Sequence, residues 1–279
     1  MWTLLRLAAL AALTVVAVLL FGGAEQLLAV ADRVASAGGI GPLPRTGAPL
    51  SSAGAGAAMA AGAGVALIGP TRRVVGQLNT LLHEVGHILV AAALGARPSG
   101  IVLRHDASGH ATARWTGRPG PVRRVSLAAT AFVGLPAPAV AAAAGAELLT
   151  SVGPRAVLWS LVGAGAVVTV LARSLWSLLV ALGLAGLAVV ALSDAAEPWA
   201  AGLAVGVVVA VAVTAVSDAA RRLQAPIPRG DDARAVRQQL RLAPRLVQTL
   251  QVLATAAAGT WTVWLLVTAA GLDTALGLR

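Results

Sequence analysis

Long apolar stretches separated by short polar segments constrain the fold of this chain more than any other feature. A helix needs about 20 residues to cross the roughly 30 Å apolar core of a bilayer. We place such stretches at about residues 4–22, 51–70, 75–95, 126–149, 155–172, 174–193, 199–216 and 246–270. The sequence therefore predicts an all-α polytopic membrane protein, a helical bundle of about 6–8 spans.

The composition supports a membrane protein and excludes some kinds of site. Of the 279 residues, 58% are hydrophobic and only 11% are charged, whereas soluble domains carry about 25% charged residues. There is no cysteine, so disulfides and thiolate metal ligands are absent. Every basic residue is an arginine, and these cluster between the apolar stretches, as the positive-inside bias predicts. We attribute the net charge of +10 to topology and to contact with the lipid bilayer, and we expect no nucleic-acid partner.

The stretch 75–95 contains the motif His83-Glu84-Val85-Gly86-His87. On a helix, positions i and i+4 share a face, so both imidazoles can bind one Zn²⁺. Glu84 then lies beside the metal, where it can take a proton from water. The alternative is a pair of histidines that only bond to neighbouring helices. We favour a metal site because ionisable groups inside membrane segments are costly and usually functional.

A polar, basic segment follows the motif over about residues 97–124. Two short alternating runs surround an Asp/Ser/Gly turn at 106–109, which predicts a short β-hairpin after the HExxH helix. Its edge could accept an extended peptide as an added strand. Further on, the apolar tract 155–193 is too long for one span, and we divide it at Arg173.

The charges orient the second half of the chain. If the hairpin and the polar segment 217–245 both lie in the cytoplasm, four spans lie between them, an even number. The charges do not decide the orientation of the first half of the chain. Since Arg72 and Arg73 precede the motif helix, either that helix is only partly inserted or one of the two earlier segments does not span.

A catalytic zinc ion usually has three protein ligands and one water. Beyond His83 and His87, the candidates for the third ligand are His105, Asp106, His110, Asp194 and Asp218. The two further histidines flank the hairpin turn and are expected to be exposed, and Asp194 lies in a short connection. Asp218 ends an apolar stretch on the side of the hairpin. It can be a ligand, or it can pair with Arg221 or Arg222 at i+3 and i+4.

These motifs resemble bacterial M50 metallopeptidases, and among them the M50B-like branch, which is related to site-2 proteases. The resemblance is carried by His83–His87 with Ala92–Ala96 after it, by Ile101–Leu103 with the turn Asp106–Gly109, and by Ser217–Pro228. It covers roughly residues 65–245 and implies a multi-span helical fold with an intramembrane zinc site. In this resemblance His83, His87 and Asp218 are the metal ligands, and Glu84 is the catalytic base.

The resemblance implies an integral-membrane zinc metalloprotease that cleaves a membrane-anchored protein substrate in a bacterial plasma membrane. We expect a core over residues 51–245, preceded by a span and loop (1–50) and followed by a last span and tail (246–279). The alternative is a non-catalytic membrane scaffold, for which an intact Glu84 would have no use. A metal transporter is disfavoured because the apolar stretches hold few other ionisable residues.

Overall fold

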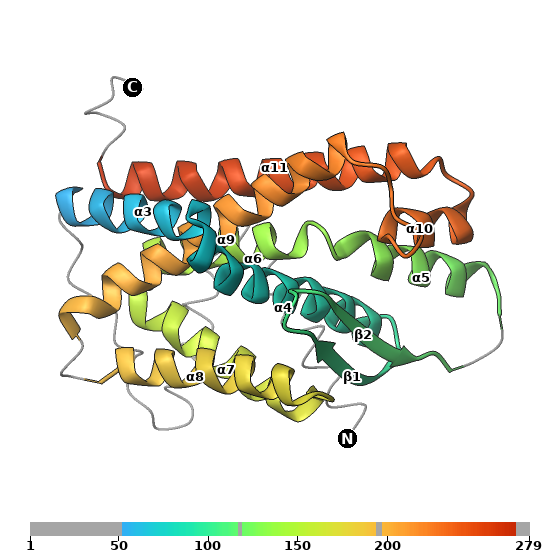
Figure 1. The fold of residues 1–279 in the computed structure, drawn as a ribbon, viewed down its shortest axis with the longest axis horizontal. Coiled ribbons are helices and arrows are strands. Elements are labelled where there is room, and N and C mark those ends of the chain that lie inside the picture. Colours follow the sequence, from blue (N-terminus) through green and yellow to red (C-terminus); the bar gives the residue numbers. More distant parts are fainter. Residues whose placement is uncertain (1–51, 117–118, 194–196, 272–279) are drawn as a thin grey trace, which may run out of the picture.

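The computed structural model describes residues 52–116, 119–193 and 197–271, which form nine helices and one two-stranded sheet (Figure 1). In chain order these elements are α3 (Ser52–Leu67), α4 (Gly69–Ala93), β1 (Arg97–Leu103), β2 (Gly109–Arg114), α5 (Pro121–Val133), α6 (Ala137–Ser151), α7 (Pro154–Leu171), α8 (Leu175–Ala191), α9 (Glu197–Gln224), α10 (Asp232–Leu240) and α11 (Pro244–Ala269). The whole segment 1–50, with the expected first span (4–22), as well as Asp194 and the tail 272–279, lies outside the described residues.

Helix α9 is the centre of the bundle and packs against α3, α4, α6, α7 and α11 (Figure 1). The main core lies between α6, α7 and α9 and consists largely of alanine, valine and leucine, including Ala146, Leu158 and Val208. Small residues let the helix backbones approach closely, which is how helices associate where no water drives them together. Proline in the first turn starts α4, α5, α6, α7 and α11, at the positions where its missing N–H is not needed.

Two pairs of consecutive helices are sharply bent. Helices α3 and α4 meet at an angle of 92°, and α5 and α6 meet at 68°. A bend of this size is the geometry of a broken or re-entrant span. This geometry is compatible with both arrangements that the charges allowed for the first half of the chain.

The long apolar helices are those of a membrane protein. The expected number of 6–8 spans is not confirmed. Helices α7, α9 and α11 are long and apolar enough to cross a bilayer, and each bent pair could add one span, so the described residues give three to five. The number is lower because the stretch 4–22 lies outside the described residues, because the stretches 51–70 and 75–95 together form one bent pair, and because α8 has only 17 residues. The predicted division at Arg173 is confirmed, since α7 ends at Leu171 and α8 begins at Leu175.

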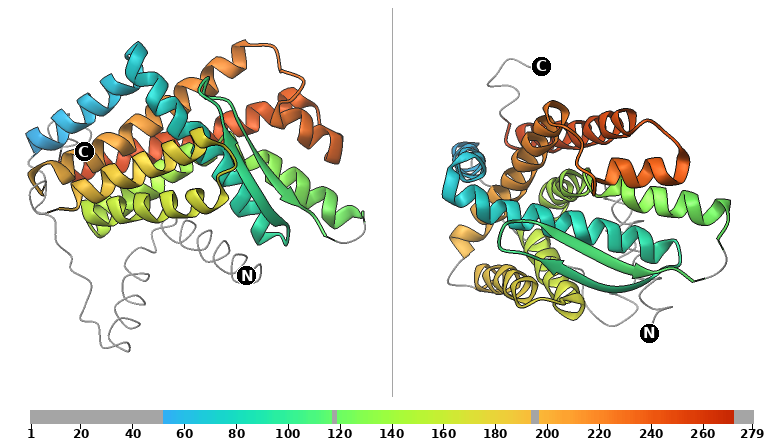
Figure 2. Two further views of the ribbon diagram at one scale, coloured as in Figure 1. Left: turned by 60° about the horizontal axis from the view of Figure 1, so that its bottom comes forward. Right: turned by 45° about the vertical axis from the view of Figure 1, so that its right-hand side comes forward.

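The predicted β-hairpin is present and packs along α4 (Figure 2). Strands β1 and β2 are antiparallel, with Ile101 opposite Ala111. The outer edge of β1 is covered by the α7–α8 corner, where the amide of Arg173 donates to the carbonyl of Ile101 over 2.9 Å. Among the described residues β2 has β1 as its only partner strand, so its outer edge is open in the sense that no further strand pairs with it.

Two glycines of α3 test the close packing of this bundle. A Cβ at Gly62 would lie 2.5 Å from the backbone oxygen of Gly206 in α9, whereas a Cβ at Gly64 would meet nothing within 4 Å. We therefore expect Gly62→Ala to lower the free energy of unfolding by about 1–3 kcal/mol, as overpacking does. Gly64→Ala should leave it unchanged or raise it by up to about 1 kcal/mol through helix propensity. Thermal unfolding in detergent measures both, and equal midpoints for the two variants would refute the α3–α9 contact.

Candidate metal centre

Helix α4 carries the motif because its polar side chains fall on one face. His83 and His87 are four residues apart, with side chains 19% and 15% exposed. Glu84 and, one turn before His83, Asn79 are buried. These groups line a cavity of about 530 Å³ between α4, the hairpin turn and the segment that leads into α10. The helix therefore presents two imidazoles and a carboxylate to one cavity.

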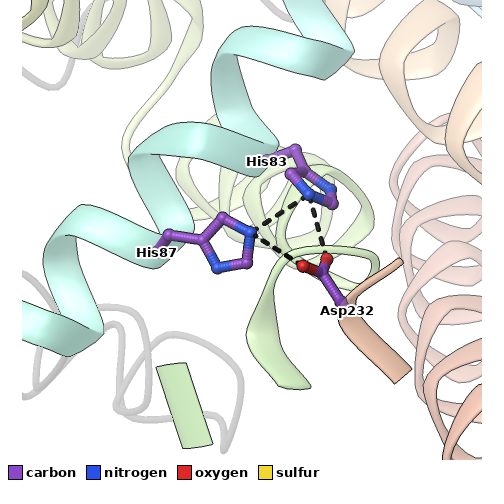
Figure 3. A group of neighbouring side chains, drawn as sticks. All are labelled: His83, His87 and Asp232. Carbon is purple, nitrogen blue, oxygen red and sulfur yellow. Dashed lines mark hydrogen bonds and ion pairs between the residues drawn. The ribbon is translucent and has the colours of Figure 1, made fainter. Parts of the chain in front are cut away.

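The third group in this space is Asp232, the first residue of α10 (Figure 3). Its Oδ2 lies 3.1 Å from Nε2 of His83, and its Oδ1 lies 3.5 Å from Nε2 of His87. The two Nε2 atoms are 3.1 Å apart. Among the described residues this is the one group of three or more potential ligands that could hold a metal ion, and its donor atoms all lie within 4.8 Å of one another.

A backbone contact sets the orientation of His87. Its Nδ1 lies 2.6 Å from the carbonyl oxygen of Thr130 in α5. Because a carbonyl can only accept, Nδ1 carries the proton and Nε2 keeps its lone pair. This arrangement is common for metal-binding histidines, whose second nitrogen is usually held by a carbonyl or carboxylate.

Asp232 is held in its charged form. Burial alone would raise its pKa, but the two imidazoles of His83 and His87 beside it outweigh burial and hold the pKa of this carboxyl well below its usual range. Its Oδ2 is buried and has no hydrogen-bond partner, and its nearest polar neighbour is the ring nitrogen of His83. A buried anionic oxygen beside two imidazole nitrogens is an environment that a cation satisfies.

Glu84 lies beside these three groups and faces the backbone amide of Ala111 in β2. A second cavity, of about 370 Å³, begins at His87 and Asp232 and is lined mainly by apolar side chains such as Ile88 and Leu127. Ala111 lines both cavities. The open edge of β2 therefore runs past the histidines and the carboxylate.

Comparison with protein families identifies the chain. The family model described as Peptidase M50B-like matches residues 56–271. The chain belongs to the Peptidase M50B-like family. Comparison with curated protein sequences gives no match, and neither does comparison with solved structures. The matched region spans all of the elements described above except the first residues of α3. Membership in this family indicates that the chain has a fold of the membrane metallopeptidase type.

In this M50B-like chain, Asp218 is not in the group of three. Its carboxylate forms ion pairs with Arg221, the partner at i+3 that the sequence allowed, and with Arg72 at 3.3 Å. It lines the larger cavity with a side chain that is 41% exposed. The expected trio of His83, His87 and Asp218 is therefore not brought together, because two arginines hold Asp218 at the cavity wall while Asp232 approaches the histidines.

The other candidates lie in the hairpin turn. His105, Asp106 and His110 are all exposed. Ser108 donates to Asp106 from its hydroxyl and its amide, and these bonds lower the pKa of Asp106. His110 lines the larger cavity but is not part of the group of three. Asp194 lies outside the described residues.

The residues present fit a zinc ion. Two imidazole nitrogens and a carboxylate oxygen are a common donor set for catalytic zinc, which leaves a fourth position for water. Two nitrogens bound to one zinc at a tetrahedral angle lie about 3.3 Å apart, close to the 3.1 Å between the Nε2 atoms here. Gly134, at the bend between α5 and α6, leaves room for the ligands, since a Cβ there would lie 2.6 Å from Nε2 of His87 and 2.6 Å from Oδ2 of Asp232.

The space at Gly134 gives a direct test of this arrangement. We expect Gly134→Ala to weaken zinc binding about tenfold or more, because the methyl group displaces His87 and Asp232 from their common point. Gly120→Ala is the matched control, since Gly120 precedes α5 and a Cβ there meets nothing within 4 Å. Competition with a zinc-chelating dye measures both dissociation constants, and equal values for the two variants would contradict the placement of Gly134.

Proposed function

We propose that this chain is an integral-membrane zinc metalloprotease that hydrolyses peptide bonds of membrane-associated proteins. The observation that carries the proposal is the convergence of His83, His87 and Asp232 beside the buried carboxylate of Glu84, in a cavity of a chain from a metallopeptidase family. We assign the third ligand to Asp232 and not to Asp218, because Asp218 is engaged by Arg72 and Arg221.

In this proposal each residue has a separate role. His83, His87 and Asp232 hold Zn²⁺, which when bound polarises a carbonyl and makes water more acidic. Glu84 accepts a proton from the attacking water at its carboxylate and passes it to the nitrogen of the leaving amine. Thr130 keeps the Nδ1 proton of His87 in place, so that Nε2 faces the site.

The substrate is proposed to bind in an extended form. Backbone groups of a membrane helix are already bonded to one another, so a helical substrate must unwind before its peptide bond can be attacked. The open edge of β2 offers replacement hydrogen bonds to an unwound segment. Asn79 supplies a further acceptor, since its Oδ1 is buried in the cavity lining without a hydrogen-bond partner.

The proposal also includes the cellular location of the chain and its partner. We propose the plasma membrane of a bacterium, on the basis of the apolar helices and an arginine-only, alanine-rich composition. The partner is a membrane-anchored protein. The alternative is a scaffold of the same fold that binds membrane proteins without cleaving them, and it differs in needing no base at position 84.

Glu84→Gln separates the protease from the scaffold. We expect this variant to keep its zinc, since Glu84 is not a ligand, and to lose about 10²–10⁴-fold in cleavage, since the base is gone. Membranes of cells that produce either form can be compared by mass spectrometry of newly formed protein N-termini. Termini that appear with the wild type and not with Glu84→Gln would support the protease. The scaffold would be supported by a different outcome. In that case the wild type binds zinc, forms no new termini and co-purifies with the same membrane proteins as Glu84→Gln.

A further inference from the structure

The third ligand is delivered by a segment that is not part of the long helices. Helix α9 ends at Gln224, and a connection with Pro226 and Pro228 leads to α10, which has only nine residues. Asp232 is the first residue of α10. The place of its carboxylate therefore depends on how α10 is docked, and not on the helix that carries the histidines.

One carboxylate ties α10 to α9. Oδ2 of Asp231 accepts from Nη1 of Arg222 over 3.0 Å, and Oδ1 of Asp231 accepts from the amide of Ala233 over 2.9 Å. The first bond joins α9 to the start of α10, and the second caps α10. The side chain of Asp231 is only 6% exposed, whereas that of Arg222 is 40% exposed, so the carboxylate end of this ion pair is the end that is shielded from solvent.

The arginine end of this contact is itself fixed. The carbonyl of Arg222 accepts from Nε2 of Gln248 in α11 over 3.1 Å, and Gln248 is buried. Inside the connection, the guanidinium of Arg234 donates to the carbonyl of Ile227 over 2.9 Å. The apolar face of α10, with Ala233 and Val236, packs against α5 and α11. The ion pair thus joins two docked elements directly beside the ligand.

We infer that the ion pair between Arg222 and Asp231 holds the start of α10 against α9 and thereby positions Asp232. We call this ion pair the latch, and Arg222 is then a positioning residue for the metal site. This inference rests on the proposed zinc site and adds to it a residue that touches neither the histidines nor the ligand carboxylate. Outer residues that orient ligands typically change metal affinity by about 10–100-fold when they are removed. The neighbouring arginine has no such link, because Arg221 pairs with Asp218 within α9.

The test compares Arg222→Ala, Arg222→Lys and the matched control Arg221→Ala in the full-length protein in detergent. The first readout is the zinc dissociation constant from competition with a chelating dye. The second is hydrogen–deuterium exchange of the α10 amides in the metal-free protein. We expect Arg222→Ala to weaken zinc binding about 10–100-fold and to speed exchange in α10, Arg222→Lys to recover part of both, and Arg221→Ala to stay within about threefold of the wild type.

The outcomes separate the latch from the zinc site. Equal behaviour of Arg222→Ala and Arg221→Ala in both readouts overturns the latch, and so does weaker zinc binding with unchanged α10 exchange. If the wild type binds no zinc, the proposed function fails, while exchange still decides the latch: faster exchange in Arg222→Ala alone supports it. Because no substrate is present in either readout, a contact between Arg222 and substrate in the cavity does not affect the result.

Discussion

The structure depends on the cost of placing polar side chains among apolar helices. His83, His87 and Glu84 occupy a helix in an apolar bundle, where unpaired polar and charged groups are expensive. The rest of the fold supplies their partners: α5 offers the carbonyl of Thr130, β2 offers the amide of Ala111, and α10 brings Asp232. The bend between α5 and α6 places irregular backbone beside this polar centre, where Leu135 lines the cavity.

Local patterns in the sequence predicted those parts of the fold that depend on neighbouring residues. The i, i+4 histidines, the hairpin after them and the break at Arg173 each follow from a period or a turn signal within a few residues. The number of spans did not follow in the same way. Hydropathy measures the length of an apolar stretch, and it does not report the bend within the stretch 126–149 or the bend between the stretches 51–70 and 75–95.

The third ligand shows the limit of local patterns most clearly. Asp218 and Asp232 both lie in the polar segment 217–245, and a carboxylate ligand has no sequence signature of its own. We considered Asp218 because it ends the apolar helix, and its possible pairing with Arg221 was evident from the spacing. Asp232 was missed because its approach to the histidines depends on the docking of α10. The available signal was an Asp-Asp pair at the start of an amphipathic segment, which is typical of a helix N-terminus.

The measurement that tests the central claim most directly is the zinc content per chain of the protein purified in detergent with zinc supplied. The account predicts about one zinc per wild-type chain, as for a single three-ligand site. It predicts loss of that zinc in Asp232→Ala and retention in Asp218→Ala, whose native side chain is paired with Arg72 and Arg221. Zinc that is retained in Asp232→Ala and lost in Asp218→Ala would contradict the account, and a wild type without zinc would remove its basis.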